Sequence, residues 1–306
     1  PESDYLAALI TDLESALPLV WGRRIDSIFF GGGTPSLLSG EGVDQLLAAL
    51  RSRLPLLPGA EITLEANPGT VEAAKFAAFR AAGISRLSLG IQSFTLRHLQ
   101  ALGRIHDDRQ ARRAIEIAAS HFDNFNVDLM YGLPGQTPAE ALADLATALA
   151  FSPPHLSCYQ LTIEPNTAFA ARPPDLPDPD SCADMQDEIE ARLAAAGYRH
   201  YEISAFARAD RQCRHNLNYW QFGDYLGIGA GAHSKLTLHD RVLRQVRWKG
   251  PEQYLAKAAA GTPLQEEFAV AASDLPFEFM LNALRLAEGF ELALFAERTG
   301  QGLQAL

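Results

Sequence analysis

Short apolar segments alternate with longer amphipathic ones along the first half of the chain. Five short segments rich in β-branched and aromatic residues predict strands: Ile25–Phe30, Glu61–Ala66, Arg86–Ile91, Phe125–Met130 and Leu156–Ile163. Apolar residues at helical spacing predict helices at Asp4–Leu17, Val43–Leu54, Val71–Ala82, Asp108–Ser120 and Ala139–Leu149. This alternation of strands and helices predicts a parallel sheet with right-handed crossovers.

The predicted strands are apolar nearly throughout, as expected where both faces of a sheet are buried. An α/β fold of either the TIM-barrel or the doubly wound type fits this pattern. Because five strands cannot close an eight-stranded barrel, a barrel would have to be partial and open, or lack a strand.

The pattern changes after Ile163. A stretch rich in Pro and Asp, Arg172–Asp180, is typical of an exposed connector. Beyond it the chain predicts helices at Cys182–Ala196, Pro251–Ala260 and Ser273–Leu286, strands at Arg199–Ser204 and Arg241–Trp248, and a glycine-rich turn at Gly227–Gly231. We therefore expect an α/β domain over residues 1–170 and a smaller α+β domain over residues 171–306.

Composition narrows the range of functions. With 26 basic and 37 acidic residues among 306, the chain has a formal charge of −11, which argues against binding to a nucleic-acid backbone. Three dispersed cysteines, Cys158, Cys182 and Cys213, are too few for a disulfide framework, so we expect a reducing, cytoplasmic environment. The charge-free run Leu145–Ile163 has two prolines at its centre and predicts no membrane helix.

Polar residues stand at the carboxyl ends of four predicted strands. Gly31–Pro35 follows the first, Glu65 and Asn67 the second, Gln92 the third, and Asp128 lies in the fourth. Because the carboxyl ends of parallel strands share one edge, we expect these residues to gather where α/β proteins bind ligands. Taken singly, each is more readily explained as a helix cap or a loop-closing group, whereas four from separate strands favour a shared site.

The loop after the first strand allows the backbone to approach a ligand closely. It lacks the GK[ST] ending of a Walker loop and the dinucleotide-binding fingerprint. With the acids Glu65 and Asp128, the amide of Gln92 and the guanidinium of Arg104, it suits a ligand with an ammonium, a carboxylate and a ribose. A barrel enzyme with Glu65 and Asp128 as an acid–base pair fits the same residues.

Histidines and large aromatic residues flank a second glycine-rich segment. Arg214–Trp220 reads RHNLNYW and Tyr225–Ser234 reads YLGIGAGAHS, which places His215 and His233 near flexible chain. Histidines beside aromatic rings are suited to ligating heme iron. The spacing fits equally well a His215 that caps a turn and aromatic residues that fill the core.

Nine ordered motifs give the chain a family resemblance. They are FFGGGTPSLL, LEANPGT, RLSLGIQSF, LGRIH, VDLMYGLPGQ, YQLTIEPNT, YEISAFA, HNLNYW and DYLGIGAGAHS. In sequence and spacing they resemble the radical S-adenosylmethionine (SAM) family of oxygen-independent coproporphyrinogen III oxidase, and more closely its heme-chaperone branch.

The resemblance implies a partial (β/α)6 TIM-like radical SAM barrel, followed by a smaller HemN-type C-terminal domain. In the family, a CxxxCxxC loop after the first strand holds a 4Fe-4S cluster whose open iron SAM chelates. This motif does not occur in the 306 residues, which begin at Pro1 inside a predicted helix and end at Leu306 soon after another. We therefore expect the first, cluster-bearing strand upstream of Pro1 and a truncated C-terminal domain.

The resemblance also implies SAM contacts for the matching residues. The expected backbone contacts to the methionine part are Gly32, Gly33 and Thr34, and the expected polar contacts are Glu65, Gln92, Arg104 and Asp128. Within this set we expect Arg104 on the SAM carboxylate, and Gln92 with Asp128 on the ribose.

Two functions follow from the resemblance. A heme chaperone would bind heme, with His215 or, second, His233 as the iron ligand, and deliver it to acceptor proteins such as membrane respiratory enzymes. A coproporphyrinogen III oxidase would use a SAM-derived radical, formed with an electron from a donor, to convert coproporphyrinogen III into protoporphyrinogen IX. The segments HNLNYW and GAGAHS resemble the carrier branch, so the sequence favours the chaperone.

Overall fold

The computed structural model describes residues 2–70 and 73–305. The chain divides into two compact units: unit 1 is Pro1–Ile28, Glu41–Glu61 and Cys213–Leu306, and unit 2 is Phe29–Gly40 and Ile62–Gln212. Strands β1 (Ile25–Phe30) and β2 (Leu56–Ala66) each run from unit 1 into unit 2. The domain boundary at residues 170/171 stays a prediction.

A mixed sheet forms the core of unit 2. The order of its strands, over the described residues, is β1-β2-β3-β4-β5-β7-β6, where β3 is Arg86–Gln92, β4 is Phe125–Tyr131 and β5 is His155–Gln160. The pairs β2/β3, β3/β4 and β4/β5 are parallel, so the predicted parallel, partial-barrel sheet is confirmed. The register places Glu65 beside Ser88, and Asp128 beside Ser157.

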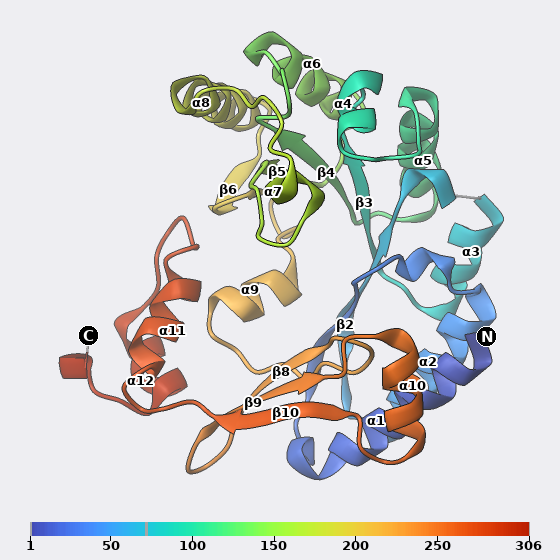
Figure 1. Cartoon of the computed structure of the whole chain (residues 1–306), viewed down its shortest axis with the longest axis vertical. Helices are drawn as coiled ribbons and strands as arrows, with labels where there is room; N and C mark the ends of the chain where they lie inside the picture. The colour runs from blue at the N-terminus through green and yellow to red at the C-terminus, as the bar shows by residue number, and fades with distance from the viewer. Residues whose placement is uncertain (1, 71–72, 306) are drawn as a thin grey trace. The chain divides into compact units, whose positions relative to one another are not determined.

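Helices cover the outer side of β3 to β5 (Figure 1). They are α3 (Ala73–Ala82), α4 (Leu96–Ala101), α5 (Asp108–His121), α6 (Pro138–Leu149) and α8 (Pro179–Ala195). Capping boxes start two of them, with Asp107 before α5 and Thr137 before α6, and each box satisfies two N–H groups. The first two residues of the predicted helix Val71–Ala82 lie outside the described residues.

The predicted strand Arg199–Ser204 is wrong in its C-terminal part. The chain instead turns back after β6 (Arg199–Glu202) into β7 (Ala205–Ala207), which pairs antiparallel with both β6 and β5. No Gly, Asn or Pro marks the reversal, and Ile203 at the turn is 53% exposed. The apolar pattern therefore continues through a turn that local sequence does not announce.

Unit 1 combines helices with a three-stranded antiparallel sheet of order β10-β9-β8. The strands are β8 (His233–Thr237), β9 (Val242–Arg247) and β10 (Leu264–Ala269). The helices are α1 (Glu2–Val20), α2 (Gly40–Arg53), α9 (Arg214–Trp220), α10 (Pro251–Ala259), α11 (Leu275–Ala283) and α12 (Leu292–Thr299). Helix α1 packs on α10.

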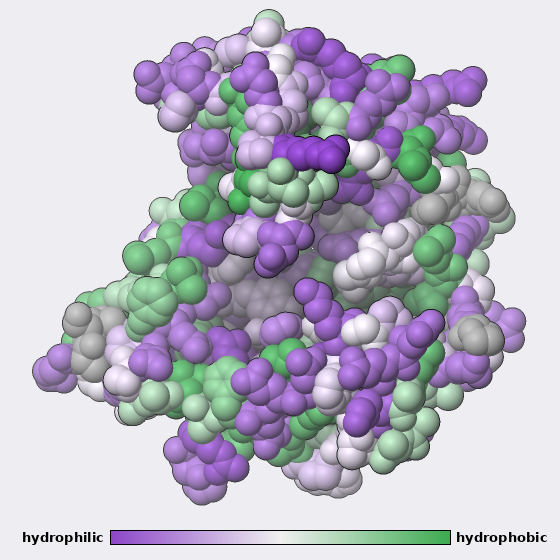
Figure 2. All heavy atoms as spheres, in the orientation of Figure 1, coloured by the Kyte–Doolittle hydropathy of each residue, from purple (hydrophilic) through white to green (hydrophobic). Residues whose placement is uncertain are grey.

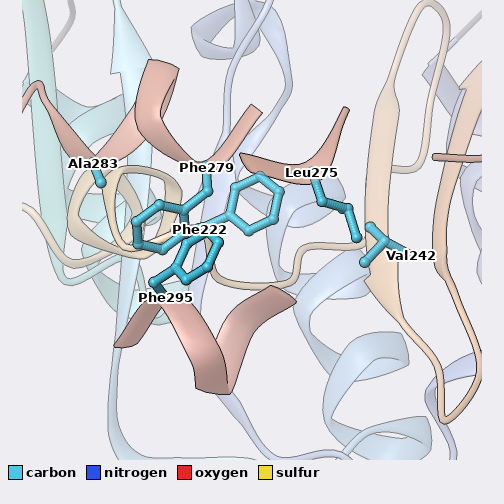
Figure 3. Packing of buried hydrophobic residues seen from close by; sticks show 6 residues of the cluster. All are labelled: Phe222, Val242, Leu275, Phe279, Ala283 and Phe295. Atoms are coloured by element: carbon cyan, nitrogen blue, oxygen red, sulfur yellow. The ribbon is translucent and has the colours of Figure 1, made fainter. Parts of the chain in front are cut away.

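An aromatic core fixes the C-terminal helices of unit 1. The ring of Phe279 lies 5.8 Å from that of Phe222 and 5.2 Å from that of Phe295, both edge-on. Figure 3 shows these rings facing one another between α11 and α12, with Leu275 directed toward Val242 of β9. Because burial of such side chains stabilises a fold by roughly 1.5–3 kcal/mol each, this cluster holds α11 and α12 in place.

The face drawn in Figure 2 is mainly polar, and apolar residues gather on its left side, where Figure 1 places α11. On and just after this helix, Phe277, Leu281 and Leu284 are each more than half exposed. Within residues 2–70 and 73–305, no helix has the length and apolar character required to cross a bilayer.

Candidate functional site

The polar residues predicted at the strand ends lie at one edge of the unit 2 sheet. The backbone N–H of Gly32, in the loop after β1, donates to Glu65 Oε2 at the end of β2, at 3.2 Å. Gln92 ends β3 and Asp128 lies in β4. Parallel pairing therefore aligns four chemical groups from distant parts of the sequence.

The glycine loop presents open backbone to this edge. Gly32 and Gly33 have φ angles of +80° and +58°, and a Cβ on either would meet no atom within 4 Å. The positive φ angles explain why glycine stands here. Since both residues are exposed, a ligand can approach their main-chain groups directly.

Asn67 connects the glycine loop to Arg104. Its Nδ2 donates to Thr34 Oγ1 at 3.4 Å, and its Oδ1 accepts from the Arg104 guanidinium at 3.4 Å. A Cβ on Gly90 would lie 3.3 Å from Asn67 Oδ1 and 3.2 Å from Gln92 Nε2. The sequence predicts Asn67 at this edge without assigning it a role. In the structure, its side chain links Thr34 to Arg104, which are both predicted SAM contacts.

Gln92 and the segment that carries Arg104 are fixed by a buried histidine. Gln92 is 9% exposed and has a φ of +69°, an uncommon conformation for a non-glycine residue. Nε2 of His106 is 3.0 Å from the carbonyl oxygen of Ile91. Burial lowers the pKa of His106 below 6.5, against the opposing effect of this hydrogen bond, so a neutral imidazole docks the loop onto the end of β3.

Asp128 is held by neighbouring side chains on the sheet. Asn126 Nδ2 donates to Asp128 Oδ1 at 2.6 Å, and Ser88 Oγ donates to Asp128 Oδ2 at 3.3 Å. Burial nevertheless raises the pKa of Asp128 above its ordinary value. Burial, and then the negative charge of Asp128, raise the pKa of Glu65 as well. An ammonium group placed near these two acids would therefore be bound favourably.

A buried chain of hydrogen bonds extends from Asp128. The sequence does not predict this chain. His155 Nδ1 lies 2.7 Å from Asn126 Oδ1, and its Nε2 lies 2.7 Å from the Tyr201 hydroxyl. Since the amide oxygen accepts, Nδ1 carries the proton and Nε2 accepts from Tyr201. Ser157 also donates to Asn126 Oδ1 at 3.1 Å. The parallel register of β4 and β5 and the antiparallel pairing of β7 with β5 and β6 bring these residues together, although they are far apart in sequence.

The strand-end residues fit SAM, and the cysteines do not fit an iron–sulfur cluster. The open glycine backbone, the two acids, an amide and a guanidinium match the amino acid and ribose parts of SAM. All three cysteines are buried, and burial raises the pKa of Cys158 to about 12 and raises that of Cys182. Within the described residues no group of metal-ligand side chains contains more than one cysteine, so the three do not form a cluster site.

The HNLNYW segment forms α9 in unit 1, with its histidine turned inward. His215 is 8% exposed, and its Nδ1 lies 3.1 Å from Cys213 Sγ. The ring of Tyr219 packs edge-on against Tyr225 at 4.7 Å. Burial raises the pKa of Tyr219 to about 12. The segment thus combines a buried histidine with a compact aromatic group.

His233 differs from His215 because its side chain is exposed at the start of β8. The glycine loop before it is fixed by α1: the N–H of Gly229 donates to Asp12 Oδ2 at 3.1 Å, and that of Ala230 donates to the Tyr5 hydroxyl at 3.3 Å. A Cβ on Gly227 would lie 2.1 Å from the carbonyl oxygen of His233, so only glycine fits there. The loop therefore presents His233 from a defined backbone.

Family profiles match both ends of the chain. Residues 12–148 match the radical SAM superfamily, and residues 270–306 match the HemN C-terminal domain. The structure of coproporphyrinogen III oxidase (HemN) from Escherichia coli, described as a radical SAM enzyme, is similar with a TM-score of 0.81 and 26% identity over 98% of this chain and 72% of that chain. The fold and the profiles define the class: a radical SAM barrel with a HemN-type C-terminal domain.

Curated relatives indicate which family within this class the chain resembles in sequence. The heme chaperone HemW of Escherichia coli K12 is 49% identical over 98% of this chain and 79% of its own length. HemW of Haemophilus influenzae is 49% identical over 100% of this chain and 80% of its own length. The chain therefore belongs to the HemW family, which confirms the resemblance read from the sequence motifs. The radical SAM domain implies SAM and a 4Fe-4S cluster as cofactors of this class.

Proposed function

We propose that this protein is a heme chaperone, which binds heme and transfers it to acceptor proteins. The observation that carries the proposal is 49% identity to heme chaperone HemW across nearly the whole chain, against 26% to the oxidase HemN. The HNLNYW and GAGAHS segments of unit 1 support it, because they supply two histidines and several aromatic rings.

The iron ligand is proposed to be one of these two histidines. A planar macrocycle must reach the imidazole nitrogen from outside, so the exposed His233 suits ligation without rearrangement. His215 is 8% exposed and would become a ligand only if α9 opened.

Heme binding can be tested with the purified chain and hemin. Wild type is expected to give a one-to-one Soret titration. One of the two variants His233→Ala and His215→Ala is expected to lose the shifted band, and that variant identifies the ligand. The control is His239→Ala, whose side chain is 91% exposed. Transfer is followed by mixing loaded protein with an apo-hemoprotein of distinct spectrum. Full heme retention in the double variant His215→Ala/His233→Ala would remove both histidines as ligands, and a wild type that binds no heme would remove the function.

The strand-end site of unit 2 is proposed to bind SAM. When bound with its cluster, SAM supplies radical chemistry to a protein of this class. Main-chain groups of Gly32, Gly33 and Thr34 would contact the methionine part, and Glu65, Gln92, Arg104 and Asp128 would supply the polar contacts. Arg104 would bind the carboxylate, and Gln92 with Asp128 the ribose.

Equilibrium dialysis with labelled SAM tests this site. Arg104→Ala is expected to weaken binding by about 10- to 100-fold, the effect of losing a charge-assisted hydrogen bond, and Arg104→Lys by less. Arg109→Ala is the matched control, because Arg109 is exposed on α5. Unchanged affinity in Arg104→Ala would remove its role.

The second candidate function is oxygen-independent coproporphyrinogen III oxidation, which the likeness to HemN favours. Under this reading the reactions would need an electron donor and produce protoporphyrinogen IX. Anaerobic incubation of the full gene product with iron, sulfide, SAM, a reductant and coproporphyrinogen III separates the two readings. Turnover without retained heme would replace the chaperone proposal. We further propose a cytoplasmic location and acceptors at the membrane; three dispersed cysteines in 306 residues favour a reducing compartment.

A further inference from the structure

Three side chains with metal-binding atoms meet in the interior of unit 1. Cys213 and His215 come from the start of α9, and Glu61 comes from β2; they are 1%, 8% and 7% exposed. One donor atom from each lies within 4.8 Å of the others. His215 Nδ1 is 3.1 Å from Cys213 Sγ and 3.9 Å from Glu61 Oε1.

These separations approach those of a tetrahedral metal centre. Zinc bonds of about 2.0–2.3 Å at tetrahedral angles keep neighbouring ligand atoms about 3.3–3.6 Å apart. His215 Nδ1 is within a few tenths of an ångström of this range from both Cys213 Sγ and Glu61 Oε1, and Cys213 Sγ lies within 4.8 Å of the Glu61 carboxylate. Side-chain movements that bring the thiol and the carboxylate closer together would close the three donors around one cation. The short Cys-x-His spacing supplies two of these donors from a single turn of chain.

Backbone contacts already orient the carboxylate toward the cluster. The N–H of Arg214 donates to Glu61 Oε1 at 2.9 Å. The guanidinium of the same residue is directed elsewhere, to the carbonyl oxygen of Gly59 at 3.0 Å and to Asp26 at 3.5 Å. Glu61 is thus positioned by a neutral donor beside a thiol and an imidazole, where a cation would balance its charge.

We propose that Glu61, Cys213 and His215 form a binding site for a zinc-class divalent cation. Thiolate, imidazole and carboxylate together are typical zinc ligands, and three protein ligands leave a fourth position for water. Binding releases the Cys213 thiol proton to solvent and changes no oxidation state. The cation would clamp the HNLNYW segment to β2 within unit 1. The site shares His215 with the two proposed heme ligands, so the cation and heme would compete for this imidazole if His215 ligates the iron, and both would bind if His233 does.

Metal titration of the purified chain tests the site. After treatment with a chelator, Zn²⁺ binding is measured by competition with a chromophoric chelator, and Co²⁺ is used as a spectroscopic substitute. Wild type is expected to bind one Zn²⁺ per chain, and Co²⁺ to give thiolate charge-transfer and tetrahedral d–d absorption. Cys213→Ser should abolish the charge-transfer band, and Glu61→Gln should weaken Zn²⁺ binding by about 10-fold or more. Cys158→Ser, which removes another buried thiol, is the control and should change neither.

The outcomes separate this proposal from heme binding and from a hydrogen-bonded thiol–imidazole pair. Absence of one-to-one Zn²⁺ binding by wild type, which requires no variant to fold, would overturn the proposal. A Co²⁺ thiolate band that survives in correctly folded Cys213→Ser would also overturn it. Zn²⁺-loaded protein should still bind hemin if His233 is the heme ligand, so a failure of heme binding leaves the metal result intact.

Discussion

Replacement of Asp12 by alanine tests how α1 fixes the glycine loop before His233. Asp12 is fully buried, and its Oδ1 lies 3.3 Å from Arg247 Nε. Its Oδ2 accepts from the N–H of Gly229 at 3.1 Å and from the Tyr254 hydroxyl at 2.9 Å. Asp12→Ala therefore removes a charge partner and two hydrogen-bond acceptors together.

The expected loss is set by what the substitution leaves behind. Arg247, 1% exposed, would keep its bonds to Ser234 Oγ and Gln245 Oε1 at 2.6 and 3.1 Å but would lose its countercharge. A buried charge left in this way destabilises a protein by about 3–5 kcal/mol. The buried N–H of Gly229, left without an acceptor, would add about 1–3 kcal/mol if the effects were independent. Because they share one carboxylate, we expect a total of about 3–5 kcal/mol.

Tryptophan fluorescence measures this loss in the right part of the molecule. Trp21, Trp220 and Trp248 all belong to unit 1, so a urea titration followed by fluorescence reports its unfolding. The control is Glu14→Ala on the same helix, which breaks an exposed pair with Arg53 at 2.6 Å and should change stability by less than about 1 kcal/mol. If Asp12→Ala matched this control, the buried network would not be what stabilises the loop.

Three further predictions concern the core and the strand-end site. Phe279→Ala, which removes a fully buried ring, should destabilise unit 1 by about 3–5 kcal/mol in the same titration, whereas Phe277→Ala at a 71% exposed site should change it by less than about 1 kcal/mol. Because the folded-state pKa of Glu65 is raised, stability should fall as pH rises above 4.5, and Glu65→Gln should reduce this slope in thermal unfolding followed by circular dichroism. Because the folded-state pKa of His106 is lowered, its loop should lose stability as pH falls below 6.5. The SAM affinity of wild type should fall over the same pH range, and that of His106→Gln should fall less.

Specific results would contradict each of these. Equal losses in the two phenylalanine variants would mean that the aromatic cluster contributes little. An unchanged pH slope in Glu65→Gln would show that its carboxyl titrates normally in the folded chain. SAM binding that weakens equally with acid in wild type and His106→Gln would place the responsible group elsewhere.

The barrel strands could be predicted because buried strands of this kind are short, nearly continuous runs of apolar residues in the sequence. The predicted ranges for β1, β3 and β4 match the structure to within a residue at either end. In unit 1, β8 was missed because Lys235 interrupts its apolar pattern. The structure buries this lysine by pairing its Nζ with Asp224 at 2.9 Å and placing it over the Phe222 ring at 4.0 Å. Only tertiary contacts make such a residue acceptable in a strand.

Some residues of the candidate site could likewise be predicted from local sequence, whereas others are brought together only by contacts between distant segments. Glu65, Gln92 and Asp128 could be placed together because Glu65 and Gln92 stand at the ends of recognisable parallel strands and Asp128 lies in the next one. The bonds between Asn126, His155 and Tyr201 could not, since they depend on the sheet register and on the unannounced turn into β7. The contact of Glu61 with His215 is equally non-local, because no sequence pattern near either residue predicts its partner.

The backbone at Gln92 adds a physical argument that this edge is a binding site. A non-glycine residue at a φ of +69° carries a conformational cost of about 1 kcal/mol or more, which glycine would avoid. Stability alone therefore favours glycine at this position. The glutamine supplies what glycine lacks, an amide that reaches the neighbourhood of Asn67 above Gly90. The strain is explained if that amide contacts a ligand at the carboxyl ends of β2 to β4, which agrees with the role proposed for Gln92 in SAM binding.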